Sequence, residues 1–271
     1  MGILCCSGPR LRESARRLKL AGEGDSLRYG KLVGEGKVAE VFEYGPGRVL
    51  KLYRAGQPES DARREFAILD AVEAVGIAAP RAFELEQFDG RWGVVMSRVE
   101  GQPFAEPMLA DPAGAGPYFI ALVRLQLGIH AASGSALAPL KVRLARKIAS
   151  TELAEPVKRS LRDRLSRLPD GDRVLHGDFH PYNILGTLED AVVVDWLDAT
   201  CGPPAADICR SWLLLQTVSN DIAEAYVAAY LAASGLDRAA IFAWLPVLAA
   251  ARLAENVPEE VAALMAMAEA G

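Results

Sequence analysis

Histidine, cysteine and long apolar runs are scarce in this chain of 271 residues, and each scarcity excludes a class of protein. The three histidines are too few to fill a histidine-rich hydrolytic metal site. The four cysteines form neither paired zinc ligands nor a dense disulfide framework, so we expect reduced thiols and a cytoplasmic protein: Cys5, Cys6, Cys201 and Cys209. Because no stretch reaches about 18 uninterrupted apolar residues, the sequence predicts no membrane span.

An excess of positive charge is also missing. The net charge is −5, from 30 basic and 35 acidic residues, which is a poor match for nucleic acid. This balance excludes neither a nucleotide, which a few local cations can hold, nor a cationic substrate, which an acidic cleft would favour. With 51% hydrophobic and 24% charged residues the chain can bury a full core, and its length fits one large domain or two closely apposed lobes.

Residues 1–24 are basic and carry little strand signal. Gly2 followed by Cys5 and Cys6 faintly resembles an acylation signal, but Cys6 occupies the place where that signal requires Ser or Thr. A signal peptide is excluded because the stretch has no basic start followed by an apolar core. We therefore expect an N-terminal tail over 1–24, disordered or folded at most into a short helix.

Residues 25–100 predict a small antiparallel sheet with one helix. Apolar runs at 31–33, 41–42 and 49–53 are punctuated by glycine, and Gly45-Pro46-Gly47 indicates a hairpin turn. A helix is expected from about 59 to 75, ended by Gly76. Two further strands, 82–88 and 92–95, flank Asp89-Gly90, a strong hairpin signal.

Residues 101–271 are mostly helical in pattern and rich in alanine and leucine. One strand-and-loop island, from 174 to 200, interrupts the helices. The expected helices cover about 116–132, 138–150, 153–167, 205–217, 221–234, 238–255 and 259–269. The chain therefore belongs to the α+β class, with a β-rich lobe, a linker near 97–101 and a larger α-helical lobe.

The island carries the candidate catalytic groups. Residues 176–185 have the sequence HGDFHPYNIL, and an aspartate, Asp195, ends the apolar run that follows. A charge in that place is expensive unless something binds it. Phosphoryl transfer needs a carboxylate that orients the attacking hydroxyl and oxygen ligands that hold Mg²⁺. Asp178 for the hydroxyl, with Asn183 and Asp195 for the metal, supplies this set.

The spacing His176-x-Asp178-x4-Asn183, followed by Asp195-Trp196, resembles the catalytic loop and metal-binding motif of aminoglycoside phosphotransferases and their choline- and fructosamine-kinase relatives. The resemblance implies a bilobal protein-kinase-like fold. It implies transfer of the γ-phosphate of ATP, with Mg²⁺, to a hydroxyl of a small aminoglycoside-, amino alcohol- or sugar-like molecule. It also implies bracing roles for His176 and Asp207 around the catalytic loop.

Two glycines in the first lobe suggest a nucleotide loop. Gly34 and Gly36 begin the pattern G-x-G-x-x-G-x-V, in which Ala39 replaces the third glycine and Val41 completes the match. Glycines let the backbone of a hairpin approach phosphate without a side-chain clash.

Lys51 interrupts an apolar strand, and Glu65 lies fourteen residues later on the inward stripe of the predicted helix. An unpaired ammonium there would be costly, so the simplest resolution is a Lys51–Glu65 pair. The kinase resemblance implies that this pair aims the ammonium at the α- and β-phosphates. The alternative is a solvated lysine and a glutamate at the rim of the helix.

Residues 94–101 resemble the hinge of the same family. The resemblance implies that Met96 walls the adenine pocket and that Val41 covers the face of the base. It further implies that the backbone C=O of Ser97 and the N–H of Val99 bond the purine edge.

Two features argue against a protein kinase. Gly177 stands where the catalytic loop of protein kinases has arginine, and only twelve residues separate Asp195 from Asp207. A switched activation loop needs both that arginine and more length. Constitutive activity on a small substrate is favoured.

Other readings stay open at this point. A non-catalytic nucleotide-binding pseudokinase would keep the same motifs, and a metallohydrolase would use His176, Asp178 and His180 as ligands. Asp198 is either close to the metal ligands or a surface charge. The acceptor site is expected on the C-terminal helices, whose carboxylates ordinarily serve solubility: Asp221, Glu224, Glu255, Glu259 and Glu260.

Overall fold

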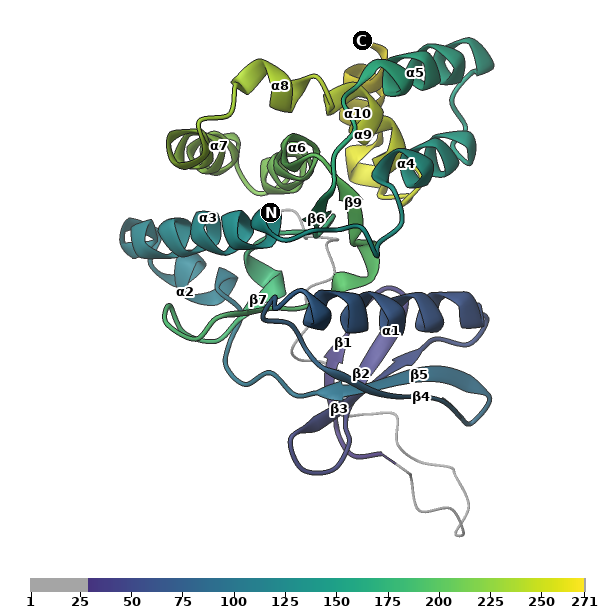
Figure 1. Cartoon of the computed structure of the whole chain (residues 1–271), viewed down its shortest axis with the longest axis vertical. Coiled ribbons are helices and arrows are strands. Elements are labelled where there is room, and N and C mark those ends of the chain that lie inside the picture. The colour runs from purple at the N-terminus through teal and green to yellow at the C-terminus, as the bar shows by residue number, and fades with distance from the viewer. Residues whose placement is uncertain (1–28, 271) are drawn as a thin grey trace.

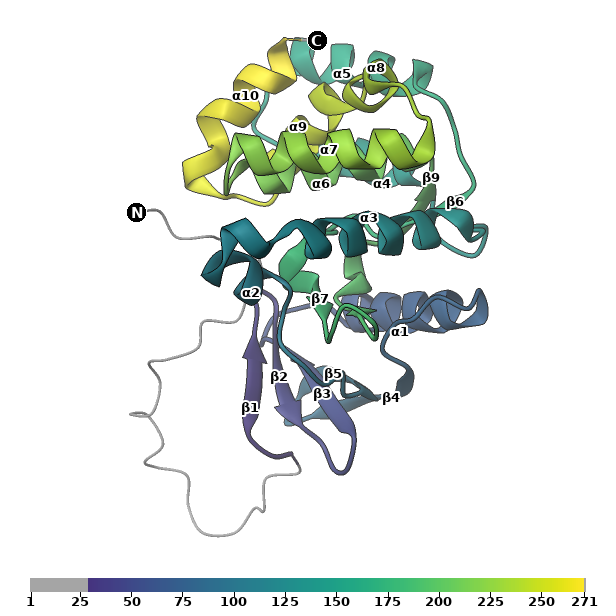
Figure 2. The ribbon, with the colours of Figure 1, turned by 90° about the vertical axis from the view of Figure 1, so that its left-hand side faces the viewer.

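The computed structural model describes residues 29–270, which form two lobes joined by a short linker (Figure 1). The smaller lobe holds the sheet and one helix, and the larger lobe is almost entirely helical, as Figure 2 shows from the side. The expected α+β, bilobal architecture is present. The predicted N-terminal tail and its acylation-like start lie outside the described residues.

The small lobe is a five-stranded antiparallel sheet in the order β1-β2-β3-β5-β4. Its strands are β1 (Leu32–Glu35), β2 (Ala39–Glu43), β3 (Arg48–Tyr53), β4 (Ala82–Phe88) and β5 (Arg91–Ser97). The β4–β5 turn consists of Asp89 and Gly90, whose φ angles of 51° and 76° both lie in the left-handed region. That backbone suits the right-handed twist of the paired strands, so the Asp-Gly signal predicted the hairpin correctly.

Helix α1 (Glu59–Ala74) lies across one face of this sheet (Figure 1). Its buried stripe is the predicted one, with Glu65 among carbon side chains: Ala62, Glu65, Ile68, Leu69 and Val72. Successive side chains of β3 alternate between faces. Val49 and Tyr53 therefore pack with the buried side chains of α1, whereas Leu50 and Leu52 pack on the opposite face of the sheet. Lys51 shares the α1 face by the same alternation.

Nine α-helices build the described part of the large lobe. They are α2 (Ala105–Ala110), α3 (Gly116–Ala131), α4 (Leu140–Ala149), α5 (Glu155–Arg167), α6 (Pro204–Gln216), α7 (Asn220–Ser234), α8 (Arg238–Phe242), α9 (Leu245–Leu253) and α10 (Val261–Glu269). Helix α6 is the central one, with eleven buried residues among its thirteen. No helix in residues 29–270 has both the length and the apolar character needed to cross a membrane.

Two helix predictions were wrong in detail. The helix expected over 238–255 is broken into α8 and α9, because Pro246 stands at the start of α9 and has no N–H to continue an earlier helix. The helix expected over 259–269 begins with a 3₁₀ turn, Pro258–Glu260, and becomes α-helical only at Val261. Helix α2 was not predicted, since it has only six residues and contains Pro107.

The strand-and-loop island is present between the lobes. Two short ladders form it: β6 (Arg173–Leu175) pairs with β9 (Thr200–Gly202), and β7 (Ile184–Leu185) pairs with β8 (Val192–Val193). The ladders place the loop at 176–183 and the turn at Asp195 beside each other and next to α1, which contacts the 3₁₀ turn Trp196–Asp198. Residues far apart in sequence thereby meet where the two lobes face each other.

Candidate active site

One buried aspartate holds the start of the catalytic loop. Asp207, on α6, accepts hydrogen bonds from the backbone N–H groups of His176 and Gly177 at 3.1 and 2.7 Å. Its Oδ2 atom also lies 3.1 Å from Gln126 Nε2 and 3.0 Å from His130 Nε2. Burial alone raises the pKa of Asp207, but these donors outweigh it and the pKa lies below its ordinary value. The carboxylate therefore stays ionised and braces the loop, as the family resemblance implied.

His176 is a structural residue of the same loop. Its Nε2 lies 3.1 Å from the carbonyl oxygen of Val194, and its Nδ1 accepts the backbone N–H of Asp178 at 3.2 Å. The side chain is fully buried, and burial lowers its pKa, so the ring is neutral. Because both ring nitrogens are engaged within the protein, His176 is not placed to bind zinc, and the metallohydrolase interpretation loses one of its three ligands.

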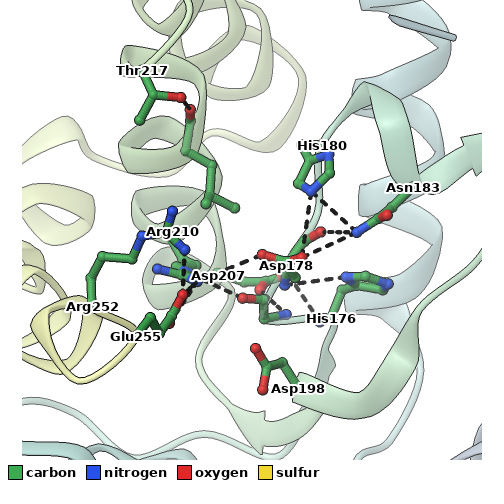
Figure 3. Close-up of polar contacts among 12 residues, drawn as sticks. His176, Asp178, His180, Asn183, Asp198, Asp207, Arg210, Thr217, Arg252 and Glu255 are labelled. Atoms are coloured by element: carbon green, nitrogen blue, oxygen red, sulfur yellow. Dashed lines mark hydrogen bonds and ion pairs between the residues drawn. The ribbon is translucent and has the colours of Figure 1, made fainter. Parts of the chain in front are cut away.

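Asp178 lies at the centre of the polar contacts in Figure 3. On one side Asn183 Nδ2 donates to its Oδ2 at 3.2 Å, and His180 Nε2 lies 3.4 Å from the same oxygen. On the other side the guanidinium of Arg210 lies 3.6 Å from Oδ1. Burial opposes ionisation of Asp178, but His180, Arg210 and His176 outweigh it and hold its pKa well below the usual range. Asp178 is therefore an oriented carboxylate, able to accept a hydrogen bond from a hydroxyl.

Lys51 joins the two lobes at the site. Its Nζ lies 2.6 Å from Glu65 Oε1, which confirms the predicted pair, and 2.8 Å from Asp195 Oδ1. Burial disfavours the charged ammonium, but Asp195 and Glu65 outweigh that effect and raise the pKa of Lys51. The Tyr53 hydroxyl donates to the second oxygen of Glu65. A permanent cation thus lies between a helix of the small lobe and the loop of the large one.

Asp195 has an unusual backbone. Its φ and ψ of 62° and 65° place a residue with a side chain in the left-handed region, which aspartate tolerates better than most residues. This turn follows β8 directly and directs the carboxylate toward Lys51 rather than along the strand. Strained backbone of this kind is concentrated at functional sites.

Asn183 and Asp195 are neighbours through the β7–β8 ladder. The N–H of Val194 donates to the carbonyl oxygen of Asn183 at 2.8 Å, which places the residue before Asp195 directly against Asn183. The Nδ2 of Asn183 is engaged with Asp178, so its Oδ1 is the atom that can face a cation. An amide oxygen and a carboxylate are hard donors of the kind that Mg²⁺ prefers. The residues present fit that metal.

The residues predicted to bind nucleotide lie in the sheet of the small lobe and in the linker that follows it. Gly34 lies in β1 and Gly36 in the turn to β2, where its N–H donates to the carbonyl oxygen of Ala39 at 2.8 Å. Val41 of β2 is paired in register with Lys51 of β3. Met96 is buried near the end of β5, opposite Val49. Ser97 ends β5, and Val99 lies half-buried in the linker that follows.

The geometry of this site agrees with the sequence comparison. A model of a phosphotransferase enzyme family, APH, matches residues 33–248, which span the small lobe, the island and most of the helices. The chain belongs to this family. The phosphotransferase is therefore a small-molecule kinase by family, with a kinase-like fold. No curated protein matches the chain in sequence.

Solved structures show the same fold at low sequence identity. The GDP and kanamycin complex of the aminoglycoside phosphotransferase APH(2'')-IIIa is 17% identical over 88% of each chain, with a TM-score of 0.61. Choline kinase LicA from Streptococcus pneumoniae is 16% identical over 86% of this chain and 85% of its own, with a TM-score of 0.60. The ADP and streptomycin complex of APH(3'')-Id from Streptomyces rimosus is 19% identical over 78% and 90%, with a TM-score of 0.58.

Several side chains around Asp178 were not expected from the sequence. Arg210, buried on α6, donates to the carbonyl oxygen of Gly177 at 3.1 Å and to Glu255 at 3.0 Å. Glu255 is therefore ion-paired within the lobe, and the interpretation of this residue as a solubility charge was wrong. Asp198 is half-buried and pairs with Arg143, so it is not a fully solvated surface charge. One feature of the sequence could have indicated a buried partner for Arg210. This arginine lies inside the apolar run of α6, where an unpaired charge is costly.

Proposed function

We propose that this phosphotransferase is a cytoplasmic enzyme that transfers the γ-phosphate of ATP, with Mg²⁺, to a hydroxyl group of a small molecule. The observation that carries the proposal is the double ion pair of Lys51, 2.6 Å from Glu65 and 2.8 Å from Asp195. It brings a cation of the small lobe to the carboxylate of Asp195. Asn183, which accepts the backbone N–H of Val194, donates in turn to the ionised Asp178. Phosphoryl transfer depends almost entirely on such positioning and charge stabilisation.

Asp178 acts on the acceptor. Its carboxylate accepts a hydrogen bond from the acceptor hydroxyl and directs the oxygen toward the γ-phosphorus. The new O–P bond forms as the bond between the γ-phosphorus and the β,γ-bridging oxygen breaks, and ADP leaves. The hydroxyl proton passes to Asp178 late in the reaction and then to solvent. His180 and Arg210, at 3.4 and 3.6 Å, hold the carboxylate in orientation.

Asn183 and Asp195 are the residues that would hold Mg²⁺ here. When bound, the metal ion stabilises the negative charge on the phosphate oxygens. Lys51 supplies a second positive charge to the α- and β-phosphates, and Glu65 keeps its ammonium in place. Titration of nucleotide with and without Mg²⁺ tests this set, because Asp195→Asn is expected to weaken binding only when Mg²⁺ is present.

The small lobe supplies the nucleotide pocket in this proposal. Gly34 and Gly36 allow the β1–β2 hairpin to approach the phosphates, since neither has a side chain. Val41 and Met96 enclose the adenine, and the backbone of Ser97 and Val99 bonds its edge. The APH(2'')-IIIa structure is a complex with GDP and the APH(3'')-Id structure is a complex with ADP, which supports nucleotide binding by this chain.

The test is an ADP-release assay with MgATP and a panel of hydroxyl compounds. Acceptor-dependent ADP release that Asp178→Ala abolishes supports the proposal. A non-catalytic nucleotide-binding module is the second candidate, favoured only by the fact that its motifs would be the same. Tight nucleotide binding with no ADP release for any acceptor would establish that candidate instead.

A further inference from the structure

The hairpin between β1 and β2 carries a lysine at its tip. The N–H of Gly36 closes the turn on the carbonyl oxygen of Ala39 at 2.8 Å, and Lys37 lies between them. Arg54, which follows β3, holds the turn in place, because its Nε and Nη2 donate to the carbonyl oxygen of Gly36 at 3.3 and 3.2 Å. The backbone beside Lys37 is therefore anchored, whereas its side chain is exposed.

Lys37 reaches from the small lobe to the large one. Its Nζ donates to the carbonyl oxygen of Glu255 at 2.5 Å, although 218 residues separate them. The side chain of Glu255 lies 3.0 Å from Arg210, whose guanidinium lies 3.6 Å from Asp178. Figure 2 shows β1 directed toward the large lobe. The ammonium thus lies on the side of the site where Asp178 would orient the acceptor hydroxyl.

The charge of Lys37 has no counter-charge in the structure. Within residues 29–270 no carboxylate forms an ion pair with it, and the carbonyl oxygen that it contacts is neutral. The neighbouring cations differ in this respect: Arg54 beside the hairpin pairs with Glu35 at 2.6 Å, and Arg210 pairs with Glu255 at 3.0 Å. Lys37 is therefore a cation that is available to an incoming anion.

The contact between Lys37 and Glu255 can be exchanged at little cost. It is exposed, so water can take the place of the ammonium at the carbonyl oxygen. The long, flexible stem of lysine lets its ammonium move while the backbone stays in place. A phosphate oxygen is a stronger partner than a neutral carbonyl, because both members of that hydrogen bond are charged.

The nucleotide geometry proposed above supplies no side-chain cation to the γ-phosphate. Lys51 is assigned to the α- and β-phosphates, and Asn183 and Asp195 to the metal. During transfer, negative charge is spread over the three equatorial oxygens of the γ-phosphoryl group, and positive groups that contact them stabilise the transition state. Gly36 would bring the hairpin tip close to the phosphates, and Lys37 follows it directly.

We propose that Lys37 is a further catalytic residue, whose ammonium leaves the carbonyl oxygen of Glu255 and binds an oxygen of the γ-phosphate when ATP enters. The proposal rests on the phosphotransferase function proposed above. Lys37 then neutralises charge while the phosphoryl group passes from the β,γ-bridging oxygen to the acceptor hydroxyl. Because ADP has no γ-phosphate, Lys37 also makes the enzyme distinguish ATP from ADP.

Paired nucleotide titrations test the contact. The Kd is measured with Mg²⁺ for ADP and for AMP-PNP, an analogue of ATP that is not hydrolysed. Lys37→Met keeps the length of the side chain and removes its charge. It is expected to raise the Kd for AMP-PNP about tenfold and to leave the Kd for ADP within about twofold of the wild-type value.

Turnover gives a second measurement. Lys37→Met is expected to lower the kcat of acceptor-dependent ADP release at least about tenfold, because the contact strengthens as charge builds on the γ-phosphoryl oxygens. Lys37→Arg keeps the positive charge and should recover most of the affinity for AMP-PNP and most of kcat. Lys31→Met removes another exposed lysine of the small lobe and is the control, with both Kd values and kcat at wild-type levels.

The outcomes separate this proposal from the proposed function. An equal loss of affinity for both nucleotides in Lys37→Met overturns it, because Lys37 would then only hold the lobes together through Glu255. Unchanged constants in Lys37→Met, or equal losses in Lys37→Met and Lys37→Arg, overturn it as well. The phosphotransferase stands in each of these cases, provided that ADP release still depends on the acceptor. A wild-type protein that binds neither nucleotide overturns the proposed function itself.

Discussion

Lys51 of β3 and Asp195 of the large lobe form an ion pair of 2.8 Å, although 144 residues separate them in the sequence. The pair lies at the junction of the two lobes, and Glu65 holds the same ammonium from the other side. The small lobe therefore delivers its cation to the carboxylate that we assign to the metal.

Removing the Asp178 carboxylate tests the catalytic assignment. Asp178→Ala is expected to lower kcat by about a hundredfold or more, because the acceptor hydroxyl loses both its orientation and its proton acceptor. The nucleotide should bind as in the wild-type enzyme, since its proposed contacts lie elsewhere. Single-turnover ADP release and nucleotide titration measure the two quantities. Wild-type turnover in this variant would remove Asp178 from the mechanism.

Removing the Lys51 ammonium should affect both stability and nucleotide affinity. Lys51→Met leaves Glu65 buried without its cation, and breaking a buried pair costs about 3 kcal/mol of unfolding free energy. The affinity for MgATP is expected to fall at least about tenfold. Urea denaturation and nucleotide titration check the two effects. Lys31→Met removes an exposed lysine of the same lobe and should change neither quantity.

Asp207 should control stability at acid pH. Its pKa in the folded protein lies below its ordinary value, so its stabilising effect is complete above the unfolded pKa of about 3.9 and is lost as the pH falls through the folded pKa. Asp207→Asn loses the carboxylate that accepts the N–H groups of His176 and Gly177, at a cost of about 1–3 kcal/mol near neutral pH.

The Asp207 variant is checked by denaturant unfolding at pH 7 and at a series of acid pH values. The wild-type advantage over Asp207→Asn should shrink as the pH falls below about 4. Asp221→Asn, on the exposed side of α7, is the control and should follow the wild type throughout. A pH-independent difference would mean that the charge of Asp207 does not brace the loop.

The local sequence pattern predicted structure correctly wherever residues close together in the chain determine it. The Lys51–Glu65 pair followed from one charge inside an apolar strand and another on the buried stripe of a helix. The Asp89-Gly90 turn could be predicted because a two-residue hairpin turn needs positive φ angles, which aspartate and glycine adopt more easily than most residues. Pattern was a poor guide to the break between α8 and α9, where alanine and leucine continue through Pro246.

The sequence by itself determined the chemical groups of the site: a loop with Asp178 and Asn183, an aspartate at the end of a strand, and a lysine and a glutamate in the small lobe. The tertiary structure alone decided which charges meet beside the catalytic loop. Arg210 and Glu255 are 45 residues apart, and Lys147 and Glu255 are 108 apart, so no local pattern joins them. Packing of α4, α6 and α9 brings these charges together in a partly buried space, where their ion pairs are strong because water screens them little.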